Sequence, residues 1–208
     1  MITILVAGDG ENQTFYNALF AILSRHLTAD PCDAEHSKEY MPIKLCQLKG
    51  FIPTKDERVI IICNGRHPIP CEPDFERIVA IVDSSDTGTV KQLIGTGLPT
   101  LTCGLRSRDT ITLSSIAEES AVVDLRRSIN CLDGSIAEAQ EFPLLHPAPI
   151  NHFLLMSAAA ALILCGRVEC LKEGFIEQSA DEISNNIIRR NAYNIRANAN
   201  SSLQTQGV

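Results

Sequence analysis

The sequence predicts an α/β protein, a three-layer sandwich with a mostly parallel sheet and a small antiparallel sheet beside it. Residues 2–7 form a short apolar run that ends at Gly8 and leads into helically spaced apolar residues, which is the pattern of a β-turn-α unit. Residues 58–63 and 77–83 are continuous apolar runs rich in β-branched residues, as in strands covered on both faces. Helical segments alternate with such runs, and this alternation favours parallel strands.

The first half of the chain supplies the expected parallel sheet. A half-buried strand at 43–48 alternates apolar and polar residues, and a further strand is expected at 99–103. Between them, Ser84, Ser85 and Asp86 offer side-chain oxygens to the start of a short helix. The helix after residue 12 has its apolar positions at Phe15, Leu19, Ile22, Leu23 and Leu27.

The second half of the chain departs from this alternation. The segments 110–116, 121–128 and 135–144 have no helix between them and are expected to make the small antiparallel sheet, with a hairpin turn at Asp133-Gly134. A long apolar helix is expected at 151–166, ended by Gly166. Amphipathic helices are expected between 171 and 195, and a disordered tail at 196–208. Residues 1–195 are therefore expected to form a single domain.

Composition excludes several classes of protein. Of the 208 residues, 45% are hydrophobic and 21% are charged, and the longest apolar stretch is too short to span a bilayer. The net charge of −7, without a long basic run, argues against nucleic acid as a partner. The chain begins with a core-type strand and no basic leader, so a cytoplasmic location is expected.

The cysteines give little support for a metal centre. The chain has eight cysteines but no Cys-x-x-Cys pair, and most of them lie inside apolar runs. Cys63, His67 and Cys71 are the one cluster with ligand-like spacing, and the prolines among them exclude a helix that would align the three side chains. We therefore expect neither a metal nor another cofactor.

The first β-turn-α unit lies where α/β proteins bind phosphate, but its residues are unsuited to that role. A phosphate-binding loop of the Gly-x-x-x-x-Gly-Lys-Ser/Thr kind needs a second glycine and a lysine that reaches the terminal phosphoryl group. The segment 8–14 has no lysine, and Asp9 and Glu11 bring negative charge to the place an anion would occupy. The sequence therefore predicts a phosphate loop that has lost its chemistry.

The order of motifs in the second half resembles that of the Mur ligase family, which joins amino acids to peptidoglycan precursors. The segments VAIVDSSD, LTCGL, DTITLSSI and INHFLLMSAAAALILCG follow one another as the corresponding strands and the His-Asn helix do in the central domain of that family. The similarity covers roughly residues 1–166. It implies an ATP-binding α/β domain and a bacterial, peptidoglycan-related setting.

The departures from the family pattern fall on its functional residues. The family's loop Gly-Thr-Asn-Gly-Lys-Ser/Thr-Ser/Thr would place its second glycine, its lysine and its magnesium-binding hydroxyl at Glu11, Asn12 and Gln13. The second asparagine of the family's helix motif, an adenine contact, is replaced by Leu155. The metal-binding glutamate and histidine have no evident counterpart between residues 41 and 76. About forty residues follow Gly166, too few for the family's C-terminal ligase domain.

These observations favour a non-catalytic Mur-ligase-like protein, a binding or assembly module with a small molecule or a protein as its partner. The alternative is an ATP-dependent amino-acid ligase-related enzyme, or another enzyme using the same cleft, although helix caps and solvated loop charges are the simpler interpretation of its carboxylates. No catalytic residue is assigned. The ligand-binding cleft is expected at the carboxyl ends of the strands and at the start of the long helix: Gly8, Asp9, Gly10, Glu11, Asn12, Thr14, Asn64, His67, Asp83, Asp86, Asn151 and His152.

A third interpretation is self-association. Ile183, Ile187 and Ile188 fall on one face of an expected helix, and the family's next domain is missing from this region of the chain. The apolar face needs a neighbour. We expect it to pack either on the long alanine-containing helix of the same chain or against a second copy in a homodimer.

Overall fold

The computed structural model describes residues 2–8, 13–27, 43–47, 58–65, 78–147 and 149–175. These residues all belong to one compact unit, Met1–Phe175. The tail and the helices expected beyond residue 175, with Ile183, Ile187 and Ile188, lie outside the described residues and stay predictions, as does the single domain 1–195. Within the described part of the chain, no helix combines the length and the apolar character that crossing a membrane requires.

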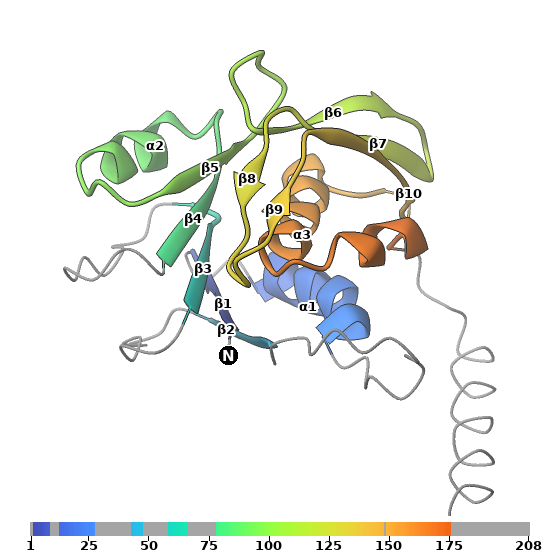
Figure 1. Cartoon of the computed structure of the whole chain (residues 1–208), viewed down its shortest axis with the longest axis horizontal. Helices are drawn as coiled ribbons and strands as arrows, with labels where there is room; N and C mark the ends of the chain where they lie inside the picture. The colour runs from blue at the N-terminus through green and yellow to red at the C-terminus, as the bar shows by residue number, and fades with distance from the viewer. Residues whose placement is uncertain are drawn as a thin grey trace, which may run out of the picture. The chain divides into compact units, whose positions relative to one another are not determined.

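The fold is built on an eight-stranded sheet with the order β10-β7-β6-β5-β4-β3-β1-β2. Neighbouring strands from β2 to β6 pair in parallel, and β7 pairs antiparallel with both β6 and β10. Of the described strands in this sheet, β7 alone therefore runs against the others (Figure 1). The strands are β1 Ile2–Ala7, β2 Ile43–Gln47, β3 Arg58–Cys63, β4 Ile78–Asp83, β5 Thr100–Cys103, β6 Ile111–Ile116, β7 Ser120–Leu125 and β10 Gln140–Leu145.

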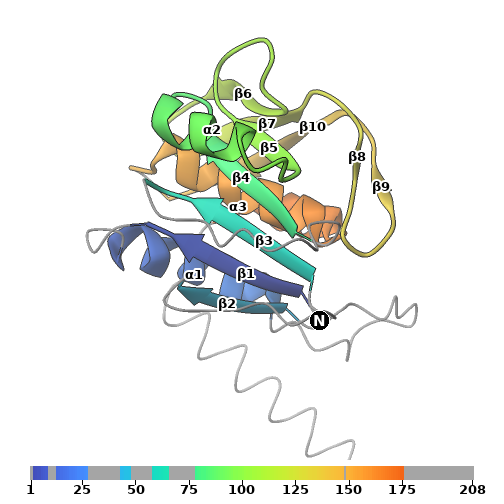
Figure 2. The ribbon, with the colours of Figure 1, turned by 90° about the vertical axis from the view of Figure 1, so that its left-hand side faces the viewer.

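The two faces of the sheet bury different residues of the same strands. In β1, Ile4 and Val6 belong to one hydrophobic core, while Leu5 and Ala7 belong to the other. The first core contains apolar residues of α1 (Gln13–Leu27) and α3 (His152–Leu164), and the second contains those of α2 (Thr87–Ile94). In Figure 2 α2 lies in front of the strands and α3 behind them. The predicted three-layer sandwich with a mostly parallel sheet is confirmed.

The arrangement of the antiparallel segments differs from the prediction in one respect. The first two segments, seen as β6 and β7, and the later part of the third, seen as β10, extend the main sheet. These strands join the sheet at the outer edge of β5. There Gly104 N donates to Ile111 O and Thr110 N donates to Thr102 O, each with a donor–acceptor distance of 3.0 Å. In this position Val123, Leu125 and Phe142 join the core under α3. The separate two-stranded sheet is smaller, β8 (Ile129–Asn130) with β9 (Ile136–Ala137), around the predicted turn at Asp133-Gly134.

The outer edge of the sheet at β10 is partly occupied. The backbone N–H of Phe175 donates to the carbonyl of Leu145 over 2.6 Å, just after the short 3-10 helix η4 (Val168–Glu173). Pro143 lies two residues before Leu145 in the same strand. A proline has no backbone N–H to offer to a further strand, and its presence is typical of an edge position.

Helix α3 is buried along almost its whole length. Every residue from Phe153 to Leu164 is buried, and the helix has apolar residues on all sides. The Phe153 ring stacks on Phe15 of α1, with ring centroids 5.7 Å apart. At the other end, the carbonyl of Leu164 accepts from the backbone N–H of Leu132 in the β8–β9 connection.

Gly166, directly after α3, occupies a position that other residues fit poorly. Its φ of +71° is left-handed, and a Cβ there would overlap the carboxylate of Asp133. That carboxylate cannot move freely, because its Oδ1 accepts from Ser135 N (2.9 Å) and Ser135 Oγ (2.6 Å). Glycine at 166 thus allows the β8–β9 turn to close on the end of α3.

We expect Gly166→Ala to reduce the free energy of unfolding by more than Gly97→Ala does. Gly97 has nearly the same φ, +70°, but open space around its Cβ position, so its variant measures backbone strain alone. That strain is about 1 to 2 kcal/mol. Urea unfolding of both variants, and of Gly166→Ala combined with Asp133→Ala, would isolate the contribution of the overlap. Equal losses in the two glycine variants would show that Asp133 does not restrict position 166.

Candidate functional site

The carboxyl ends of β1, β3, β4 and β5 lie along one edge of the sheet, where α/β proteins usually bind ligands. Backbone hydrogen bonds continue past the strand ends. Asn64 N donates to Ala7 O and Ser84 N donates to Cys103 O, each at a distance of 2.8 Å. Of the cleft residues predicted from the sequence, Gly8, Asn64, Asp83 and Asp86 lie on this edge. Asp9, Gly10, Glu11, Asn12 and His67 are outside the described residues, so their part of the cleft stays a prediction.

Asp86 caps α2, as the sequence predicted. Its Oδ1 accepts from the backbone N–H groups of Gly88 and Thr89, both at 3.1 Å, and its Oδ2 lies 2.6 Å from the Thr89 hydroxyl that donates to it. Both carboxylate oxygens therefore satisfy groups at the start of the helix. In this conformation Asp86 is a structural residue of the edge.

Asp83 has a smaller local role. Its Oδ1 accepts from the backbone N–H of Ser85 over 2.7 Å, which holds the turn between β4 and α2. The residue is half-buried at the end of β4. Both carboxylates predicted for the cleft at the end of β4, Asp83 and Asp86, therefore accept hydrogen bonds from the turn or helix that follows the strand.

Asp109 is a buried carboxylate of this region that the sequence analysis did not identify. It is 3% exposed, and its Oδ2 accepts from Ser84 Oγ (3.0 Å) and from the backbone N–H of Arg106 (2.7 Å). Gly104 lies against this pair so closely that a Cβ would overlap both partners. The network joins the end of β4 to the β5–β6 loop. A glycine and an aspartate at the two ends of a short loop are the only sequence signal for it.

The cysteines near this edge are poorly suited to ionise. Burial, and to a lesser degree the charge of Asp86, raises the pKa of Cys63 to about 12. Burial also raises the pKa of Cys103 well above its usual value, with smaller contributions from Asp83 and Asp109. Cys63 is also one of the three residues with the spacing of zinc ligands. Of its two candidate co-ligands, His67 and Cys71 both lie outside the described residues.

The start of α3 carries two further residues of the predicted cleft. Asn151 is the N-cap, and its side chain accepts from the backbone N–H of Leu154 over 3.1 Å, while His152 is exposed. The stacked rings of Phe15 and Phe153 place the start of α3 beside the start of α1, where Thr14 is exposed. The structure thus brings Thr14 to the same region as Asn151 and His152, although more than a hundred residues separate Thr14 from this pair along the chain.

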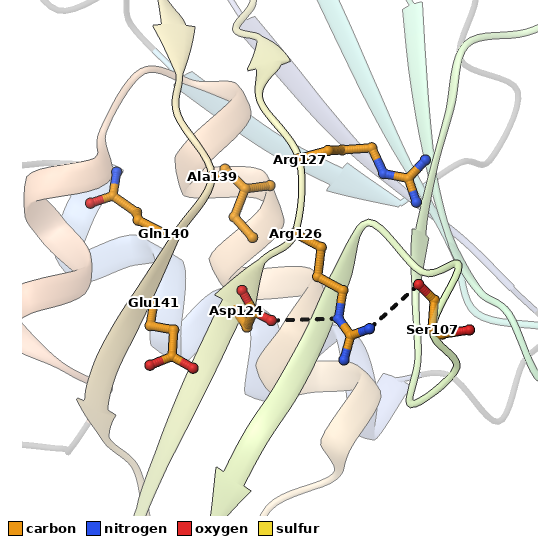
Figure 3. A pocket seen from close by; sticks show the side chains of 8 residues that line it. Ser107, Asp124, Arg126, Arg127, Ala139, Gln140 and Glu141 are labelled. Carbon is orange, nitrogen blue, oxygen red and sulfur yellow. Dashed lines mark hydrogen bonds and ion pairs between the residues drawn. The ribbon is translucent and has the colours of Figure 1, made fainter.

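A hollow at the end of β7 contains none of the predicted residues. Its volume is about 710 Å³, and Figure 3 shows Arg126 between Asp124 and Ser107. Arg126 Nε lies 3.4 Å from Asp124 Oδ2, and its Nη1 donates to Ser107 O over 3.4 Å. Arg127 Nη2 donates to Arg108 O. Both arginines thus hold the β5–β6 loop to the end of β7, which is a structural role.

A second cavity, of about 480 Å³, lies between the β6–β7 turn, the end of β10 and the start of α3. The ring of His146 lines it and is 2% exposed. His146 was not among the cleft residues predicted from the sequence. The remaining lining residues are Ile116, Ala117, Glu118, Pro149, Ile150 and His152.

The capping role of Asp86 can be measured directly. We expect Asp86→Ala to lower the free energy of unfolding by about 1 kcal/mol, because two backbone N–H groups at the start of α2 lose their acceptor. Asp86→Asn should retain most of the stability, since asparagine caps equally well, and Ser85→Ala in the same turn is the control. Equal losses for the alanine and asparagine variants in urea unfolding would contradict the capping role.

The buried thiols predict a loss of stability at alkaline pH. Cys63 and Cys165 both have a pKa raised to about 12 from an ordinary value near 9, mainly by burial. Between these values the unfolded chain releases the proton and the folded chain keeps it, so folding stability falls as pH rises from 9 towards 12. Each thiol contributes a slope of about 1.4 kcal/mol per pH unit.

The matched variants are Cys63→Ala and Cys165→Ala, compared with Cys46→Ala, which changes a half-buried thiol. Unfolding in urea at pH 8.5, 9.5 and 10.5 should show a shallower loss of stability in the first two variants than in the third. The same slope in all three would contradict the role of the buried thiols.

Comparison with known proteins finds structural similarity only, since no family model and no curated protein sequence matches the chain. The UDP-N-acetylmuramoylalanyl-D-glutamyl-2,6-diaminopimelate–D-alanyl-D-alanyl ligase of Acinetobacter baumannii is 14% identical over 86% of this chain and 49% of its own, with a TM-score of 0.44. A second structure, MurF from the same organism, is 15% identical over 84% of this chain and 44% of its own (TM-score 0.46). MurF ligase from Thermotoga maritima in complex with ADP is 11% identical over 81% of this chain and 45% of its own, with a TM-score of 0.39. The chain thus spans less than half of each, and similarity at this level identifies neither an activity nor a ligand.

Proposed function

We propose that the chain is a binding or assembly module, a Mur-ligase-like α/β domain that does not carry out ATP-dependent ligation. The observation that supports this most directly is the composition of the segment 8–14. It follows β1 at the carboxyl edge of the sheet, yet it has no lysine to reach a phosphoryl group and contains two carboxylates. A triphosphate at this place would meet repulsion from Asp9 and Glu11.

The neighbouring strand end supports the same proposal. In phosphoryl transfer, carboxylates near the phosphates commonly hold the metal ion that neutralises them. Here both oxygens of Asp86 accept hydrogen bonds from α2, and Asp83 accepts from Ser85. Recruiting Asp86 to a metal would uncap the helix. The proposed role is therefore recognition of a small molecule or a protein in the bacterial cytoplasm, in a peptidoglycan-related process.

One observation favours a second candidate, an enzyme related to the ATP-dependent amino-acid ligases. Asn151 and His152 at the start of α3 occupy the two positions of the family's His-Asn pair, in the reverse order, and α3 begins beside α1, which follows the altered loop. Nucleotide bound beside this helix start would not depend on a phosphate-binding lysine. The two candidates differ in a measurable property, the affinity for nucleotide.

Nucleotide titration separates them. We expect no thermal shift of the wild-type protein with magnesium ATP, whereas a ligand at 100 times its dissociation constant would stabilise the fold by about 2.7 kcal/mol. Glu11→Gly combined with Asn12→Lys restores the two family residues and should give measurable affinity, because the lysine supplies a positive charge and the loss of Glu11 removes repulsion.

The control is Glu11→Gly combined with Asn12→Gln, which changes the same positions without adding the positive charge. It should bind nucleotide less tightly than the lysine variant. Micromolar affinity of the wild type for ATP, or ATP hydrolysis above the rate of the buffer, would refute the proposed function and favour the ligase-related enzyme.

A further inference from the structure

Four exposed arginines meet at the β5–β6 loop, which projects from the body of the domain in both Figure 1 and Figure 2. Arg106 and Arg108 belong to the loop itself. Arg126, which follows β7, donates to the backbone carbonyl of Ser107, and its neighbour Arg127 donates to that of Arg108. These four arginines, called the arginine patch below, gather positive charge in one place on a chain whose net charge is −7.

Little negative charge balances the arginine patch within the described part of the chain. There the four arginines make a single ion pair, from Arg126 Nε to Asp124 Oδ2 over 3.4 Å. The side chains of Arg106 and Arg108 make no hydrogen bond or ion pair with the described residues. Asp109, the acidic residue of the loop, is 3% exposed. Like charges held close together repel each other, and an anion bound at the loop would relieve that repulsion.

The loop is held in one shape before any partner binds. Asp109 Oδ2 accepts from the backbone N–H of Arg106 over 2.7 Å, and Asp109 N donates to the Arg106 carbonyl over 3.1 Å. Where the loop leaves the sheet, Gly104 N donates to Ile111 O over 3.0 Å. A guanidinium has five N–H groups, so the bonds from the two arginines after β7 to the loop leave donors for a partner. A surface that is already ordered loses less entropy on binding.

The groups around the arginine patch indicate which anion it binds. A guanidinium pairs with both oxygens of a carboxylate or a phosphate. Leu105, next to Arg106, is 67% exposed and offers an apolar contact beside the charges. Residues 105–108 and 124–127 include no aromatic ring on which a nucleic-acid base could stack. A protein segment with carboxylates and an apolar side chain therefore matches the patch better than nucleic acid does.

The carboxylates near the arginine patch restrict where the anion lies. Asp124 and Glu141 are paired across β7 and β10, and both line the hollow at the end of β7. In Figure 3 the Arg126 side chain extends toward Ser107, on the opposite side of Asp124 from Glu141. An anion that filled the hollow would be repelled by these two carboxylates. The loop side of the patch is therefore the contact surface.

We propose that the arginine patch docks an acidic segment of a partner protein. Carboxylates of the partner pair with the guanidinium groups on the loop side of the patch, and an apolar side chain of the partner covers Leu105. The inference rests on the proposed function, because it names the kind of partner that a binding module of this fold recognises.

The two proposals can fail separately. ATP is itself an anion, so the nucleotide titration is repeated on Arg106→Gln combined with Arg108→Gln. Nucleotide binding that remains in this variant belongs to another part of the chain, and it would refute the proposed function without affecting the arginine patch. Nucleotide binding that this variant loses would show that the patch takes phosphate, and it would overturn the docking proposal.

The first test compares three probes by calorimetric titration into the full wild-type chain. The first is a peptide of six glutamates and two leucines, the second is the same peptide with glutamine in place of glutamate, and the third is an oligothymidylate of equal charge. We expect the glutamate peptide to bind at least about tenfold more tightly than either of the others. Equal binding of the two peptides, or tighter binding of the oligothymidylate, would overturn the proposal.

Charge variants locate the contact. Arg106→Gln combined with Arg108→Gln should weaken the glutamate peptide about tenfold, because each lost charge removes an exposed ion pair. The matched control is Lys44→Gln combined with Lys91→Gln, which removes two exposed charges elsewhere and should leave the affinity within about twofold. Equal weakening by the two double variants would show that net charge, and not the arginine patch, attracts the peptide.

A variant of Leu105 tests the apolar part of the contact. Leu105→Ser should weaken the glutamate peptide several-fold, because the peptide's leucine loses the surface that it covers. The same variant should bind a peptide with glycine in place of leucine as tightly as the wild type does. An equal effect on both peptides would show that no apolar side chain of the peptide lies on Leu105, and the proposed docking on the loop would be wrong.

Discussion

The structure depends on the burial of α3 from Phe153 to Leu164. A helix that is apolar on every side cannot leave any side in water, so each side needs a covering element. The sheet covers one side, α1 and η4 pack against others, and the β8–β9 connection donates one hydrogen bond to the last carbonyl, that of Leu164. Each fully buried leucine or isoleucine in the helix stabilises the fold by about 1.5 to 3 kcal/mol. The run Ala158–Ala161 presents small side chains that let its neighbours approach closely.

The same helix determines which parts of the chain can form a site. Its start lies against the start of α1 through the stacked rings of Phe15 and Phe153, so the first residues of α1 and the Asn151 cap are neighbours. Its approach segment, from Pro149 to His152, closes the cavity next to His146. The predicted cleft residues Asn151 and His152 and the cavity next to His146 therefore share one helix start, and a substitution that displaced α3 would alter both.

Local patterns predicted the elements well, because their causes are local. The β-branched run Arg58–Cys63, the capping oxygen of Asp86 and the Asp133-Gly134 turn each act within a few residues of themselves, and each has its predicted structure. The joining of β6 to the edge of β5 could not be read from the sequence, because it depends on which sheet edge is free after folding. The Asp109 network and the buried ring of His146 are of the same kind. Asp109 accepts from Ser84, which is 25 residues away in the chain, and His146 is surrounded by the β6–β7 turn and the start of α3, so no local pattern marks either residue as buried.

The outer edge of β10 has a consequence for how this protein meets other chains. Residues in a strand alternate in the direction of their backbone groups, so Leu145, whose carbonyl binds Phe175 N, shares its outward direction with Pro143 and Glu141. The carbonyl of Leu145 is already bonded, Pro143 has no N–H, and Glu141 carries a charge. These three features disfavour continuation of the ladder by a strand from another molecule, as at the protected sheet edges of other β-proteins. A contact with another chain at β10 would therefore depend on side chains more than on backbone pairing, which makes it dependent on the partner's sequence.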